Sequence, residues 1–197
     1  MGDFASKDAD NNSAGWANTG AIFDISFAYK LGEGNFGITA LLRGQANFLD
    51  TDALTNELFL QEPSVNWAVE SDAWSVSGFM IGGFRTFPMS EKVSFDTKIL
   101  IGFSSASSPE LTITDINSTA WVIQKSSSAT SFAYLLGVGF KFSVGNRIYL
   151  MTNIDYFGSK PEFSNVETIA SDGSIYIDTW SQSISTINLG FGIALKI

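Results

Sequence analysis

Two residue types that carry much of enzyme chemistry are missing from this chain of 197 residues, which contains neither cysteine nor histidine. Without histidine there is no Ser-His-Asp or Cys-His nucleophile pair, no imidazole general base and no usual zinc site. Without cysteine there is no thiolate chemistry, no iron–sulfur cluster and no disulfide. We therefore expect a protein that is not an enzyme and that carries no cofactor.

Charged side chains are also scarce, at 16% of the residues, whereas soluble domains carry about 25%. The balance of 20 acidic and 11 basic residues gives a formal net charge of −9, which argues against a nucleic-acid partner. Long hydrophobic runs are absent as well. The longest, residues 132–140, is about half of the roughly 18 residues that a membrane-spanning helix needs.

Strict alternation of apolar with other residues recurs in seven segments, and this period of two predicts β-strands. We expect one domain, 1–197, of the all-β class. The predicted strands are 21–31, 36–48, 74–85, 93–104, 131–142, 148–157 and 184–197.

The connections between these strands alternate in length. After an N-terminal segment at 1–17, short connections at 32–35, 86–92 and 143–147 alternate with long loops at 49–73, 105–130 and 158–183. Loops beyond about 12 to 15 residues are uncommon in compact domains. Short turns at one end and long loops at the other are typical of an antiparallel, up-and-down transmembrane β-barrel.

The two faces of the predicted strands differ in composition. The apolar face, to which we assign the even-numbered residues of 74–85, carries no charge, and its few small exceptions include Gly44, Gly78 and Gly82. The other face is rich in Gly, Ser and Asn rather than in the Lys and Glu of a solvated surface. Its nine charges are Asp24, Lys30, Arg43, Arg85, Asp96, Lys98, Lys141, Asp155 and Lys196. This segregation favours lipid outside and a crowded polar interior, because Lys or Arg facing the bilayer midplane costs about 2 to 4 kcal/mol.

We expect part of this interior charge to form an ion network. If Glu33-Gly34 is a two-residue hairpin turn, opposed residues sum to 67, which places Asp24 across from Arg43. The predicted network consists of Asp24, Arg43, Asp96, Lys98 and Asp155. Structural ion pairing accounts for these carboxylates with less effort than catalysis does.

Aromatic residues gather near both ends of the strands and resemble the aromatic girdles of a membrane barrel. Near the short turns are Tyr29, Phe36, Phe84, Phe95 and Phe142. Near the long loops are Phe48, Trp74, Phe103, Phe132, Tyr134 and Tyr156.

Residues 15–197 thus resemble the small outer-membrane β-barrel family of Gram-negative bacteria, the OmpA/OmpX/OmpW-like barrels. The resemblance rests on the alternation, the loop asymmetry and the closing strand 187–197. It implies an eight-stranded, porin-like barrel in the cell outer membrane, monomeric and without its signal peptide. The implied partners are membrane lipid and lipopolysaccharide.

Two features depart from that family pattern. The chain ends in Ile197 rather than in an aromatic residue, and seven strands are visible where such barrels have an even number. We expect a first strand that is missing or truncated, with residues 1–4 as its end and 5–18 as the loop that follows. The other interpretation is that 174–180 only lengthens the last strand.

The loops and the N-terminal segment together hold 15 of the 20 acidic residues. The plainer interpretation is a solvated, self-repelling surface. The functional one is weak binding of divalent cations beside lipopolysaccharide, with Asp50, Asp52 and Glu57 as candidates, or contact with an extracellular partner.

Three functions remain open from the sequence. The first is a structural or surface-presenting role, with acidic extracellular loops above a lumen filled by side chains. The second is an OmpW-like conduit for small apolar molecules, for which Gly44, Gly78 and Gly82 on the lipid face are a faint hint. The third is a soluble β-sandwich or calycin-like protein that binds a small ligand, and it requires the apolar face to lie inside.

Overall fold

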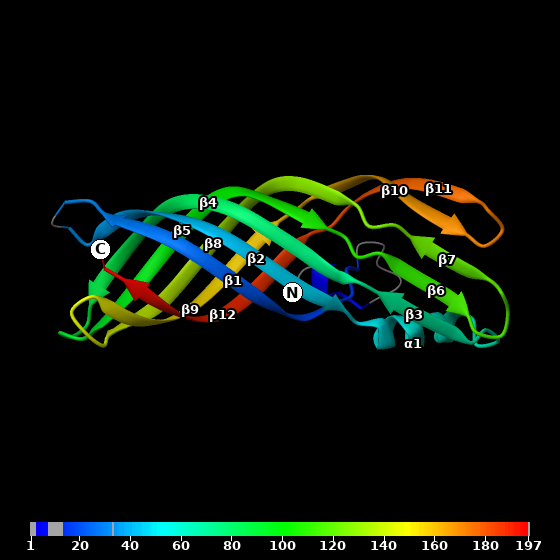
Figure 1. The fold of residues 1–197 in the computed structure, drawn as a ribbon, viewed down its shortest axis with the longest axis horizontal. Helices are drawn as coiled ribbons and strands as arrows, with labels where there is room; N and C mark the ends of the chain where they lie inside the picture. Colours follow the sequence, from blue (N-terminus) through cyan, green and yellow to red (C-terminus); the bar gives the residue numbers. More distant parts are fainter. Residues whose placement is uncertain (1–2, 8–13, 33, 197) are drawn as a thin grey trace.

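The structure is a computed structural model that describes residues 3–7, 14–32 and 34–196. In these ranges the chain forms two antiparallel β-sheets, the helix α1 (Thr51–Gln61) and a short 3₁₀-helix, η1 (Asp3–Ala5). Figure 1 shows an elongated molecule, in which the larger sheet curls into a barrel and the smaller sheet projects beyond one end of it. The prediction of an all-β, antiparallel, barrel-like architecture is confirmed at this level.

The larger sheet contains the seven predicted strands, with ends that differ from the prediction by a few residues. They are β1 (Ala17–Lys30), β2 (Phe36–Leu49), β4 (Ala73–Pro88), β5 (Val93–Ser107), β8 (Ser128–Ser143), β9 (Ile148–Ser159) and β12 (Ile184–Leu195). They pair in this order as a meander. In the described ranges no ladder joins β1 to β12, so the barrel wall keeps one seam between these two edge strands.

The first hairpin has the register expected from its turn. Asp24 pairs with Arg43, and Lys30 pairs with Gly37. Gly32 adopts a φ of 62°, in the left-handed region that suits glycine in a tight turn. Of the expected two-residue turn, Glu33-Gly34, Glu33 lies outside the described residues.

The long connections are not irregular loops as expected, because each of them contributes at least one strand to a second, five-stranded sheet. The first connection supplies α1 and β3 (Trp67–Ser71). The second supplies β6 (Leu111–Asp115) and β7 (Trp121–Gln124), and the third supplies β10 (Glu162–Ala170) and β11 (Ile175–Ser181). The order is β11-β10-β7-β6-β3, so strands from all three connections pair in one sheet. Residues 175–181 are therefore a separate strand and do not lengthen β12.

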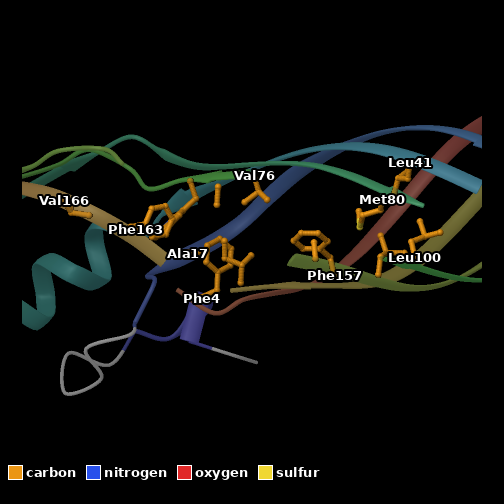
Figure 2. Packing of buried hydrophobic residues seen from close by; sticks show 14 residues of the cluster. Phe4, Ala17, Leu41, Val76, Met80, Leu100, Phe157, Phe163 and Val166 are labelled. Atoms are coloured by element: carbon orange, nitrogen blue, oxygen red, sulfur yellow. The ribbon is translucent and has the colours of Figure 1, made fainter. Parts of the chain in front are cut away.

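The N-terminal segment packs against the barrel where the two sheets meet. Phe4 is buried and packs edge-on against Trp74, with ring centroids 5.4 Å apart, and the Trp74 Nε1–H donates to the Gly15 carbonyl at 2.9 Å. Phe163 and Trp180 complete this aromatic cluster. Figure 2 shows Phe4, Ala17 and Phe163 gathered beneath Val76. The expectation that residues 1–4 end a strand is wrong for Asp3 and Phe4, which are helical, while Met1 and Gly2 lie outside the described residues.

The face assignment for β4 is also wrong. Arg43 pairs with Gly78, so the even-numbered residues of β4 point inward, and Trp74 and Met80 are buried. Phe79 and Ile81, expected inside, are about half exposed on the outer face. The reason is that the buried face of β4 carries the more continuous apolar set, including Trp74 and Met80, while the outer face mixes apolar with polar residues, so alternation alone points to the wrong face. Gly78 and Gly82 therefore line the interior, which removes them as a hint of a gap in the outer face.

The aromatic cluster predicts how firmly the N-terminal segment is held. We expect Phe4→Ala to lower the free energy of unfolding by about 3 kcal/mol, because it removes a fully buried ring. Limited proteolysis should then cleave residues 3–16 much faster than in the wild type. Phe59→Ala is the matched control, since Phe59 is 52% exposed on α1 and should change stability by less than about 0.5 kcal/mol. Equal effects of the two substitutions would contradict this role of Phe4.

Candidate functional site

The interior of the barrel holds a charged network centred on Arg43. Its guanidinium is fully buried and lies between two carboxylates. Nε and Nη2 donate to Asp24 at 2.8 and 2.7 Å, and Nη1 and Nη2 donate to Asp155 at 2.9 and 3.0 Å. Both contacts are bidentate, which is the strongest geometry available to an Arg–carboxylate pair. The Phe157 ring lies 5.7 Å from the guanidinium carbon.

This network connects the two sides of the seam. Asp24 is on β1, Arg43 on β2 and Asp155 on β9, while Asn188 on β12 donates to Asp155 at 3.1 Å. Lys98 approaches the other oxygen of Asp155 at 4.0 Å. Side chains from both unpaired edge strands therefore meet on one buried arginine and its carboxylate partner.

A second ion pair lies nearer the short turns. Lys141 on β8 forms an ion pair with Asp96 on β5. Asp96 was expected in one network with Asp24, Arg43, Lys98 and Asp155, whereas the ion pair that it forms is with Lys141. A cavity of only about 60 Å³ adjoins this pair, lined in part by Ser26, Thr39, Lys98 and Asn153. The space suffices for a few water molecules, since each takes about 30 Å³ in the liquid.

Large side chains occupy much of the remaining interior. Leu41, Met80, Leu100 and Leu135 are at most 2% exposed. Figure 2 shows Leu41, Met80 and Leu100 grouped inside the strands. With three cations against three carboxylates the interior is neutral in formal charge, and its groups neutralise one another rather than activate a nucleophile.

The three loop carboxylates proposed as metal ligands have other surroundings. Asp50 caps α1, because its Oδ1 accepts from the Ala53 N–H at 3.0 Å and its other oxygen contacts Lys7. Asp52 and Glu57 belong to α1 itself. In the part of the chain that the structure describes, no group of three or more acidic residues is arranged to hold a metal ion. In the same part, no helix is long and apolar enough to cross a membrane.

Charge is strongly polarised along the molecule. The long connections, in residues 49–73, 105–130 and 158–183, hold 12 acidic residues against two basic ones, Lys125 and Lys160. The short-turn end has the opposite excess. Its cations are Lys30, Arg85, Lys92, Arg147 and Lys196, and its acidic residues are Glu33 and Glu91. The two ends would therefore favour chemically different surroundings.

Three residues of these sites were missed or misplaced from the sequence. Lys141 and Asn188 were assigned inward but not to the network, and Arg85 was expected inside although β4 turns it outward. The Asn188–Asp155 pairing depends on the register of β9 with β12, which follows from no short turn. No local signal gives the position of Arg85, because its pairing with Phe36 depends on the register of β2 with β4, in which Gly78 lies opposite Arg43.

Removal of the central arginine should be more harmful than removal of the whole pair. We expect Arg43→Met to lower the free energy of unfolding by about 3 to 5 kcal/mol, since it leaves the buried Asp155 carboxylate without its partner. The double variant Arg43→Met/Asp155→Leu should recover much of that loss. Asp24→Asn should cost less, because the Asp24 side chain is 26% exposed. Urea titrations followed by tryptophan fluorescence measure these variants together with Asp155→Leu alone, and additive effects of the two single substitutions in the double variant would contradict the pairing.

The cap of α1 gives a pH-dependent prediction. The Lys7 hydrogen bond, together with that of the Ala53 N–H, holds the pKa of Asp50 below its ordinary value of 3.8. A lowered pKa means that the ionised cap stabilises the fold above the unfolded-state pKa, and this stability is lost as pH falls through the folded-state pKa. We expect a carboxyl ¹³C NMR titration of Asp50 to give a midpoint below 3.8 that rises in Lys7→Gln. The distant Lys125→Gln should leave it unchanged, and an unshifted midpoint in Lys7→Gln would refute the assignment.

Comparison with protein-family models, with curated proteins and with solved structures gives no match to this chain. The arrangement of its own charged, apolar and acidic surfaces is therefore the basis for a functional proposal.

Proposed function

We propose that this chain is a non-enzymatic β-barrel protein of the Gram-negative outer membrane, with a structural or surface-presenting role. The observation that carries this proposal is the distribution of polarity in the barrel, which is reversed relative to a soluble protein. Arg43 and Asp155 are buried inside, while large apolar side chains such as Phe27 and Phe191 are 70% and 77% exposed on the outer face. Soluble monomers rarely expose contiguous apolar patches beyond a few hundred square ångströms.

The extent of the apolar outer face matches the thickness of a membrane. On β8, outward residues from Phe132 to Phe142 are all large and apolar, and on β12 the same holds from Ile187 to Leu195. These spans cover 11 and 9 residues, and a tilted transmembrane β-strand needs about 9 to 11. Exposed apolar residues also cover β1, β2, β4, β5 and β9. The apolar band therefore runs over every strand of the larger sheet.

An eighth strand completes this proposal. β1 and β12 both run from the projecting sheet toward the short turns, so a strand that is antiparallel to both must run the other way between them. A second copy of the chain inserted in the same orientation cannot supply such a strand, because its edge strands run in the same direction as β1 and β12. Open backbone groups facing lipid cost several kcal/mol each, and bacterial barrels have an even number of strands. We therefore place an eighth strand at the seam.

The filled interior favours a structural role over a conduit for small apolar molecules. Buried leucines, Met80 and the Arg43 network fill much of the lumen, and the adjoining cavity has room for only a few waters. The functional surface is then the acidic five-stranded sheet with α1, which we place on the extracellular side beside lipopolysaccharide. It suits divalent cations shared with lipopolysaccharide phosphates, or an extracellular partner.

A single outward substitution tests membrane insertion. We expect Ile101→Lys to lower the free energy of unfolding in phospholipid vesicles by about 2 to 4 kcal/mol, because Ile101 is 54% exposed in the middle of the outer face. Ile116→Lys is the matched control, since Ile116 is 59% exposed beside β6, outside the proposed span, and should change stability little. Equal effects of both variants, or a wild-type protein that stays monodisperse in buffer without detergent, would refute the proposal.

A further inference from the structure

Arg85 is placed unlike the other cations at the short-turn end. It lies on the outer face of β4, and its guanidinium carbon is 4.7 Å from the ring centroids of both Phe36 and Phe87. Phe36 is its cross-strand partner on β2, and Phe87 follows two residues later on the same face. The rings fix the guanidinium through cation–π contacts.

The hydrogen-bonding capacity of Arg85 is left unused by this arrangement. A guanidinium has five N–H donors in a planar fork that matches the oxygens of a carboxylate or a phosphate. In the described part of the chain, no carboxylate forms an ion pair with Arg85, in contrast to Arg43. Among the described residues Arg85 is thus a fixed cation without an anionic partner, and its fork is available to an anion from outside the chain.

The neighbourhood of Arg85 resembles a lipid headgroup boundary. Ring contacts continue from Phe87 through Phe95 to Phe140 and Phe142, which together form an aromatic belt across β4, β5 and β8. Arg85 lies three residues, or about 10 Å along the strand, from the end of β4 at Pro88. Aromatic belts mark the membrane–water interface, where long basic side chains reach toward the headgroups.

We propose that Arg85, held between Phe36 and Phe87, binds the phosphate of an anionic phospholipid headgroup. This inference rests on the proposed membrane function. A phospholipid is favoured over lipopolysaccharide because the short-turn end is basic, with Lys92 and Arg147 in its turns, and lies opposite the acidic sheet that we place among lipopolysaccharide. Arg85 supplies a bidentate, charge-assisted contact, and the lysines of this end add a diffuse attraction.

Lipid competition tests the assignment. The protein is folded in mixed micelles of phosphatidylglycerol and phosphatidylcholine with identical acyl chains, and the retained lipid is read by native mass spectrometry. We expect the wild type to keep phosphatidylglycerol preferentially, because the choline cation of phosphatidylcholine opposes the approach of its phosphate to a second cation. Arg85→Gln should reduce that preference about tenfold, the factor that one charge-assisted contact represents. Arg85→Lys keeps the charge without the fork and should recover only part of it. Phe36→Leu/Phe87→Leu should weaken the preference while leaving the charge in place.

Arg147→Gln is the control, because it removes an exposed turn cation of the same end and should change the preference by less than about twofold. A parallel competition replaces phosphatidylcholine with lipid A. An unchanged preference in Arg85→Gln, an equal loss in Arg147→Gln, or stronger retention of lipid A than of phosphatidylglycerol in that parallel competition would overturn the inference. Insertion is scored separately by heat-dependent migration on SDS gels and by protease protection in vesicles. If the protein does not insert into the membrane, both the proposed membrane function and this inference are refuted. If it inserts but shows no lipid preference, only this inference is refuted.

Discussion

The ion pairs of Arg43 are the constraint on which the arrangement of the barrel depends. Its two carboxylate partners come from strands far apart in the chain, since Asp155 follows Arg43 by 112 residues and Asp24 lies in the first strand. Hydrogen bonds between backbones hold consecutive strands together, but no ladder in the described ranges joins β1 to β12. The guanidinium, with Asn188 bound to Asp155, supplies side-chain bonds across the seam instead. A buried ion pair contributes little net stability, yet it disfavours other registers that would leave one charge unpaired.

The narrow interior of the barrel accounts for the small residues on the inward face of the strands and for the hydrophobic residues on the outward face. Strands that curl this tightly leave little room, so small residues such as Gly78 stand opposite the large Arg43, and Met80 and Leu100 fill the next level. Hydrophobic residues that would form the core of a soluble domain lie outside instead. This explains how the mean hydropathy can be slightly positive, at +0.14, without a single long apolar run.

Much of the barrel could be predicted from the sequence, because alternation is a local property. All seven strands and the register of the first hairpin follow from it. The orientation of β4 does not, since Trp74 and Met80 on one face are as apolar as Phe79 and Ile81 on the other. The pairing of Asp155 with Arg43 depends on how far the strands are staggered around the barrel, which no short segment encodes. The second sheet was missed because three of its strands, such as Leu111–Asp115, have only four or five residues, and the two longer ones carry acidic residues within them.

The five-stranded sheet makes the three long connections interdependent. β6 pairs with β3, and β7 pairs with β10, so each connection completes its hydrogen bonding only with strands from another. The surface that they form is a conformational epitope rather than a set of separate peptides. Substitutions in one connection are therefore limited by the strands of the others with which it pairs. An antibody raised against one connection as a linear peptide would not recognise the folded surface, because that conformation exists only when all three connections are folded together.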